Sequence, residues 1–214
     1  WPARVGALAL LATPWDFHAE GGVPILARQL LAALRPSLEH CLGNLPALPV
    51  DLLQALFLGL DPALGLRKFS DFAALDQASA TAAEFVALEE WLNEGVPLTR
   101  QAGIDCLLRW YGENRLAAGR WSVAGTPVVP SRIACPSLVV LPQNDRIVPE
   151  PTAAPLGRLI PAAQVLTPRA GHIGMVVGRR AQAELWHPLA DWFEHSLQAG
   201  AGKPGAASPR SARD

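Results

Sequence analysis

"LVVLPQNDRIVP", residues 138–149, is an apolar run that ends in a polar turn carrying Asp145. Short apolar runs bounded by turn residues are typical of strands that are buried on both faces of a parallel sheet. "VGALALLAT" (5–13) and "AQVLTP" (163–168) have the same character. We therefore predict a parallel sheet flanked by helices, which is an α/β fold.

The long region between the first two predicted strands has helical periodicity. Its apolar residues recur at helical spacing in three stretches: Leu53/Leu56/Phe57/Leu60, Phe85/Leu88/Leu92 and Ile104/Leu107/Leu108/Tyr111. We expect Gly95 to stop the second of these helices in a C-cap position. A small hairpin over 119–129 is expected to lead back to the sheet, and a last helix over about 180–197 to kink at Pro188.

Four segments follow from this order of elements. Residues 1–19 form a core strand and the loop after it, and residues 20–130 form a mainly helical cap. Residues 131–198 form the C-terminal α/β core. Residues 199–214, which are small, polar and rich in Pro and Gly, form a disordered tail.

Composition excludes several classes of protein. The 18 basic and 19 acidic residues leave a net charge of −1, which provides no basic surface for nucleic acid. The richest apolar stretch, "LLQALFLGLDPALGL", is interrupted by Asp61 and Pro62, so we expect no transmembrane segment. No signal-peptide pattern is visible before the first predicted strand. The first residue is Trp1 and the only methionine is Met175, so we expect the chain to be a piece of a longer product, cut at its amino end.

The three cysteines, Cys41, Cys106 and Cys135, are an odd number at wide spacing with no CxxC pair. This spacing predicts neither a disulfide framework nor a zinc site, and we expect no bound metal or cofactor. A reducing compartment, the cytoplasm, fits this usage best.

Asp145 and His172 each follow a predicted strand by a few residues. Ligands of open α/β sheets lie beyond the carboxyl ends of the strands, so both side chains should project from the same edge. The order of acid and then histidine is that of a nucleophile–acid–histidine hydrolase. Histidine suits the role of a base near neutral pH, and a carboxylate on its other ring nitrogen fixes the tautomer. We predict that Asp145 and His172 are catalytic.

Other interpretations of these residues are open. An aspartate after a strand is commonly a turn residue or a helix cap. His187 and His195 fall on the last helix and are expected to face solvent or to pack. His40 lies beside Cys41, but neighbouring helical residues point to different faces. His18 follows the first strand, and we retain it as a candidate for substrate contact.

A nucleophile elbow requires small residues around the nucleophile, typically Gly-x-Ser/Cys-x-Gly. No serine or cysteine here has that setting, and Cys135 leads into a strand rather than out of one. The elbow should precede a helix and then the strand at 5–13. We therefore expect the nucleophile to lie upstream of Trp1 and this chain alone to be inactive.

Five motifs together resemble the poly(3-hydroxyalkanoate) synthase family over about residues 1–195: "LLATPWDFHAEGG", "EEWLNEGVPL", "WYGENRLAAGRWSVAG", "IACPSLVVLPQNDRIVP" and "AGHIGMVVG". The resemblance implies the C-terminal part of an α/β-hydrolase fold with a helical cap insertion. It implies that Asp145 and His172 are the catalytic aspartate and histidine, and that the nucleophile is a cysteine. The implied reaction transfers (R)-3-hydroxyacyl groups from coenzyme A, a substrate rather than a bound cofactor, to a growing polyester. Association with polymer granules is implied as well.

Two other functions remain open at this point. The first is an esterase or thioesterase of the α/β-hydrolase type, with water as the acceptor. The second is a non-catalytic truncated subunit or interaction protein that pairs with a complete synthase subunit. A homodimer is a further expectation, since an apolar helical cap is a natural site for subunit pairing.

Overall fold

The computed structural model describes residues 5–58 and 62–201, and the chain forms two compact units. The first unit combines Trp1–Gly22 with Gly119–Asp214, and the second unit is Val23–Ala118. Residues 119–130, which the sequence pattern assigned to the helical cap, therefore group with the sheet. The reason is that η3 (Pro130–Arg132), which follows them directly, packs against α6 (Glu150–Leu159) of the first unit.

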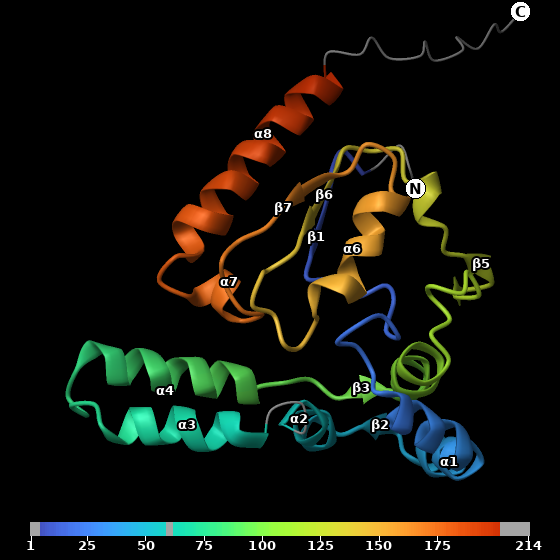
Figure 1. The fold of residues 1–214 in the computed structure, drawn as a ribbon, viewed down its shortest axis with the longest axis horizontal. Helices are drawn as coiled ribbons and strands as arrows, with labels where there is room; N and C mark the ends of the chain where they lie inside the picture. Colours follow the sequence, from blue (N-terminus) through green and yellow to red (C-terminus); the bar gives the residue numbers. More distant parts are fainter. Residues whose placement is uncertain (1–4, 59–61, 202–214) are drawn as a thin grey trace, which may run out of the picture. The chain divides into compact units, whose positions relative to one another are not determined.

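A three-stranded parallel sheet is the centre of the first unit (Figure 1). Its strands are β1 (Leu8–Leu11), β6 (Ser137–Val140) and β7 (Gln164–Leu166), in the order β1-β6-β7. The prediction of parallel strands at these places is confirmed. All of β6 is buried, whereas β1 is half-buried and β7 is partly exposed. Burial on both faces thus holds for β6 only, because within the described residues it alone has a strand on each side.

Helices flank this sheet. α6 follows β6 and packs against it with buried Ala153 and Leu156. α7 (Gly174–Val177), η4 (Gln182–Trp186) and α8 (His187–Ala201) follow β7. η4 is a π-helical turn, and the helix becomes α-helical one residue before Pro188, close to the predicted kink. α8 continues to Ala201, so residues 199–201 of the predicted tail are helical, and residues 202–214 lie outside the described part.

The predicted hairpin over 119–129 is confirmed. β4 (Ser122–Val123) pairs antiparallel with β5 (Thr126–Pro127). The two residues between them, Ala124 and Gly125, have φ of 49° and 77°. Left-handed conformation at both central residues is typical of the type I′ turn that joins two-residue hairpins.

The second unit is mainly helical, as predicted. It contains α1 (Ile25–Asn44), α2 (Val50–Leu58), α3 (Pro62–Ala73), α4 (Ala80–Asn93), α5 (Arg100–Ile104), the π-helical η2 (Asp105–Gly112), and the antiparallel pair β2 (Ala47–Leu48) and β3 (Leu98–Thr99). Its core cluster contains Leu42, Leu48 and Leu108, with Ile104 and Leu107 packed against it. The apolar stripe over 104–111 therefore does face a core.

Two details of the predicted helices differ or lie outside the described part. α4 ends with Glu94 as its C-cap, not Gly95, whose φ is not positive. Gly95 is instead a point of close approach, because a Cβ there would lie 2.7 Å from Cγ1 of Val50. Leu60, the last member of the stripe from Leu53, is outside the described residues.

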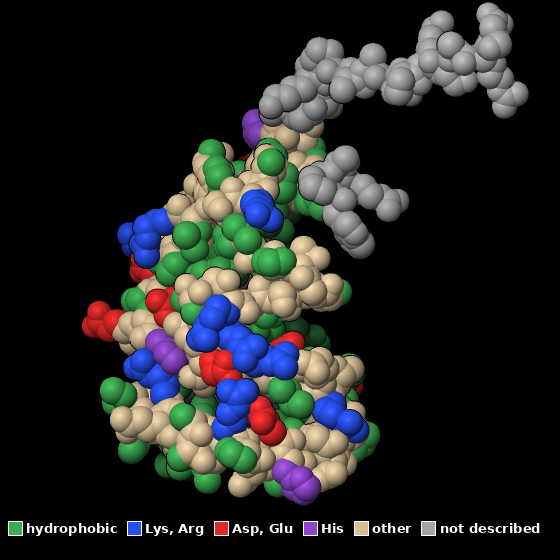
Figure 2. All heavy atoms as spheres, turned by 90° about the vertical axis from the view of Figure 1, so that its right-hand side faces the viewer, with side chains coloured by type: hydrophobic (Ala, Val, Ile, Leu, Met, Phe, Trp, Pro, Cys, Tyr) green, Lys and Arg blue, Asp and Glu red, His purple; other side chains and the backbone are tan. Residues whose placement is uncertain are grey.

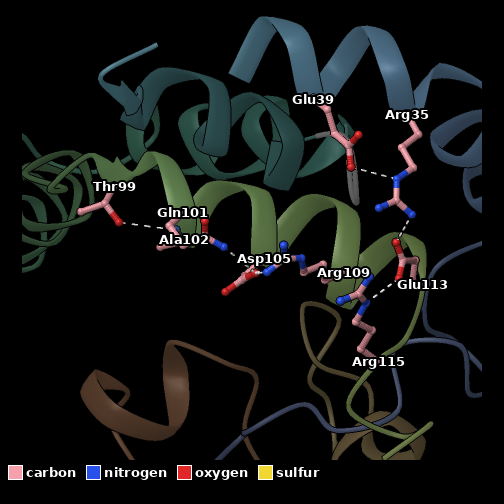
Figure 3. A network of polar contacts seen from close by, with 9 residues as sticks. All are labelled: Arg35, Glu39, Thr99, Gln101, Ala102, Asp105, Arg109, Glu113 and Arg115. Carbon is pink, nitrogen blue, oxygen red and sulfur yellow. Dashed lines mark hydrogen bonds and ion pairs between the residues drawn. The ribbon is translucent and has the colours of Figure 1, made fainter. Parts of the chain in front are cut away.

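A network of charged side chains joins α1 to η2 on the second unit (Figure 3). Arg35 pairs with both Glu39 and Glu113, and Glu113 also accepts from Arg115. Burial raises the pKa of Glu113, but the hydrogen bonds and charges of Arg115 and Arg35 outweigh it and lower that pKa overall. Such partly exposed pairs contribute about 0–1 kcal/mol each, so this network is structural support rather than a reactive site.

Basic and acidic side chains are mixed on the face drawn in Figure 2, so this face is neither purely basic nor purely acidic. This agrees with the net charge of −1. Across residues 5–58 and 62–201, none of the helices combines the length and apolar character needed to cross a membrane.

Candidate active site

Asp145 lies in the turn that follows β6, and its side chain is 0% exposed. Buried Leu141 and Pro142 continue the strand, and the N–H of Asp145 then donates to the carbonyl of Pro142. Oδ1 of Asp145 accepts from the backbone N–H groups of Ile147 (2.9 Å) and Val148 (2.7 Å). The aspartate is therefore a turn residue, as one interpretation of the sequence held, but only one of its two oxygens serves the turn.

The second oxygen of Asp145 contacts His172. Nδ1 of His172 lies 2.8 Å from Oδ2 of Asp145. An ionised carboxylate can only accept, so this geometry places the Nδ1 proton between the two groups and leaves Nε2 as an acceptor in the neutral ring. The His172 side chain is 28% exposed. A buried carboxylate thus orients a solvent-accessible imidazole, which is the arrangement a general base requires.

Backbone pairing beyond the strands brings these two residues together. The N–H of Leu141 donates to the carbonyl of Leu166, the last residue of β7, at 2.8 Å. After both strands end, the N–H of Gln143 donates to Pro168 at 3.0 Å and that of Asn144 to Ala170 at 3.1 Å. The two loops therefore continue side by side from the carboxyl edge of the sheet. The predicted convergence of Asp145 and His172 at this edge is present in the structure.

His18 lies at the same edge, in the loop after β1. This loop is fixed to α6, because the N–H groups of Trp15 and Asp16 both donate to the carbonyl of Thr152, at 2.8 and 2.9 Å. The backbone N–H of His18 donates to Oδ1 of Asp16 at 3.0 Å. The role of His18 in substrate contact stays a prediction. No local pattern in the sequence indicates the role of Thr152.

The remaining histidines have local partners. His40 contacts Asn44 one turn later on α1, and His187 lies 3.5 Å from Gln182. Nδ1 of His195 lies 2.6 Å from the carbonyl of Asp191. His187 and His195 are exposed on α8, in agreement with the expectation that they face solvent.

Cys135, the cysteine of the first unit, is poorly placed to act with this pair. Cys135 precedes β6, whereas Asp145 follows it, so the length of the strand, about 13 Å, separates the two positions. Cys106 lies in the second unit, where burial raises the pKa of its thiol to about 11. Within the described ranges, no three His, Cys, Asp or Glu residues are arranged to hold a metal ion.

Comparison with known proteins identifies relatives of one kind. No family model matches the chain. Curated relatives named poly(3-hydroxyalkanoate) polymerase subunit PhaC match it in Haloferax mediterranei (25% identity, 94% of this chain, 41% of the relative), Haloarcula marismortui (27%, 89% and 40%) and Synechocystis (26%, 90% and 52%). The resemblance seen in the motifs is confirmed: the chain is a homologue of these subunits along about nine tenths of its length. It spans about half or less of theirs.

Solved structures give weaker likenesses. A putative non-heme bromoperoxidase BpoC from Mycobacterium tuberculosis has 17% identity and a TM-score of 0.47, and covers 91% of this chain and 60% of its own. An esterase from Thermogutta terrifontis has 17% identity and a TM-score of 0.37, with 92% and 58% covered. Both scores lie below 0.5, and the fold assignment rests on the parallel sheet flanked by helices. The chain has the α/β fold predicted for it, with a parallel sheet and helices that flank it.

Proposed function

We propose that this chain supplies the histidine and the aspartate of an acyltransferase of the poly(3-hydroxyalkanoate) synthase type. The observation that carries the proposal is the 2.8 Å contact between His172 and the buried carboxylate of Asp145, at the carboxyl edge of a parallel sheet. The homology to polymerase subunits supports the choice of reaction. The substrates would be (R)-3-hydroxyacyl thioesters of coenzyme A and the growing polyester, and the nucleophile a cysteine outside these 214 residues.

In the first step, Nε2 of His172 would take the proton of the cysteine thiol. The thiolate then attacks the thioester carbonyl, the bond to the coenzyme A sulfur breaks, and the leaving thiolate regains the proton from the imidazolium. Exchange of one thioester for another is nearly balanced, and thiolates are strong nucleophiles, so a cysteine suits this step. Asp145 holds the ring in the tautomer that accepts at Nε2 and stabilises the imidazolium.

In the second step, a hydroxyl group must attack the acyl-cysteine. His172 takes the hydroxyl proton, an ester bond forms, and the cysteine thiolate leaves and is reprotonated. An alcohol is far less acidic than a thiol, so this step depends more on the base and on the carboxylate behind it. Water in place of the hydroxyl would give hydrolysis from the same residues.

The test is His172→Gln in the full-length protein that contains the proposed cysteine, with exposed His187→Gln as the matched control. Coenzyme A release and polymer formation are followed from a 3-hydroxyacyl-coenzyme A. We expect His172→Gln to abolish polymer formation and to slow coenzyme A release, and His187→Gln to retain both. Full activity of His172→Gln would reject the proposal. A wild-type protein that releases free hydroxy acid without polymer would instead identify a thioesterase.

A further inference from the structure

Two side chains of the π-helical turn η4 reach the segment that carries His172. Oε2 of Glu184 accepts from the backbone N–H of Arg169 at 2.6 Å, three residues before the histidine. Nε1 of Trp186 donates to the carbonyl of Val176 at 2.9 Å, four residues after it. The two contacts therefore bracket His172 along the chain.

The same segment is held on its other side by the loop that carries Asp145. Gln143 and Asn144 donate to the carbonyls of Pro168 and Ala170. These bonds place the two loops side by side, but they do not involve the N–H of Arg169. That N–H donates its hydrogen bond to the carboxylate of Glu184. A backbone amide that donates to a carboxylate makes one of the stronger hydrogen bonds in proteins.

η4 is itself held in the core of the first unit, so it can support the segment that carries His172. Between the two contacting residues lies Leu185, which is 2% exposed and belongs to the core of the first unit. The turn joins α7 to α8, which lie next to each other in Figure 1. Glu184 also lies 3.8 Å from Arg180, an exposed pair that contributes little. Single π-helical turns within helices are rare and occur frequently at functional sites.

We propose that Glu184 and Trp186 are positioning residues that hold His172 against Asp145 from the side opposite the Asp145 loop. The proposal rests on the function proposed above. Their hydrogen bonds go to the backbone on either side of the ring, and both residues act through that backbone. A base must be held to within a fraction of an ångström of its working position, and a misplacement of about 1 Å can cost about 100-fold in rate.

The first test needs only the 214-residue chain and follows backbone amide hydrogen exchange. In Glu184→Ala we expect the Arg169 amide to lose protection by about 10-fold or more, because its acceptor is gone. Glu184→Gln keeps an acceptor oxygen and should retain most of the protection. Glu194→Ala, an exposed glutamate on α8, is the control and should change nothing at Arg169. Unchanged protection in Glu184→Ala would overturn the inference.

The second test measures steady-state polymer formation in the full-length enzyme. We expect Glu184→Ala to lower kcat about 10- to 100-fold with KM changed by less than about twofold, since the substrate contacts are intact. Glu184→Gln should recover most of the rate. Trp186→Phe, which removes the Nε1 donor together with part of the ring, should lower kcat in the same sense. Trp91→Phe in the second unit makes the same change of side chain and should not.

The outcomes separate this inference from the proposed function. If His172→Gln is inactive but Glu184→Ala and Trp186→Phe have wild-type kcat, the positioning role is wrong and the proposed function stands. If His172→Gln is fully active, the proposed function fails, and the exchange test on the 214-residue chain still decides whether Glu184 holds the loop. An equal loss in Glu184→Ala and Glu184→Gln would reject the backbone contact as the cause.

Discussion

Asp145→Asn should slow the two proposed steps of the reaction to different degrees. The side chain is fully buried, Oδ1 holds two backbone N–H groups and Oδ2 faces Nδ1 of His172. Asparagine keeps one oxygen, which the N–H groups of Ile147 and Val148 will retain, so the turn should survive. Its NH₂ group then faces Nδ1 as a donor. The neutral imidazole of His172 then adopts the other tautomer, in which Nδ1 accepts and Nε2 carries the proton. Nε2 can no longer accept a proton, so the base is lost.

The expected losses differ because the two nucleophiles differ in acidity. A thiol of ordinary pKa is about 3% ionised at pH 7 without any base, so acylation should fall by no more than about 30-fold. An alcohol has no useful ionised fraction. The equivalent change in a serine protease triad lowers kcat by about 10⁴-fold, and we expect a loss of that order in chain growth.

The assay is a single-turnover experiment on the full-length enzyme that follows coenzyme A release and polymer elongation separately. Asp145→Asn should release coenzyme A at a reduced rate and then stall. Asp191→Asn on the exposed face of α8 is the control and should behave as wild type. Equal loss of both steps would refute the reasoning and would favour a hydrolase in which Asp145 only orients His172.

Three further outcomes are expected. The 214-residue chain alone should release no coenzyme A from a hydroxyacyl-coenzyme A, because none of its cysteines lies in an elbow; measurable release contradicts this. The folded pKa of Cys106, about 11, exceeds the unfolded value of 9.0, so the folded state keeps this proton longer. The resulting stability is complete below pH 9, and about 2–3 kcal/mol of it should be lost as pH rises to 11. Urea unfolding should show this loss in wild type and Cys41→Ala but not in Cys106→Ala. Finally, Leu48→Ala should lower the free energy of unfolding by about 2–5 kcal/mol and Leu52→Ala, at an exposed position, by less than about 0.5 kcal/mol; similar losses would contradict the assigned core.

The sequence by itself was enough to predict the strands and the residues of the candidate site. Apolar runs at 5–13, 136–143 and 163–168 predict strands because only a buried strand tolerates so few polar side chains over so short a length. Parallel strands end at one edge, so the order of Asp145 and His172 was enough to predict that they meet. Gly95 misled the prediction because a close approach to Val50 and a C-cap favour the same residue.

Only the tertiary structure decided which residues hold the loops at the carboxyl edge of the sheet. Glu184 and Thr152 are distant in sequence from the loops they hold, and each acts on backbone groups, which every residue type carries. No side-chain pattern can therefore indicate such contacts. The boundary between the two units could not be predicted from the sequence either. A hairpin that follows a helical region belongs to the unit against which its neighbouring residues pack. Periodicity reports which face of an element is buried, whereas the partner that buries it is chosen by packing among segments far apart in the chain.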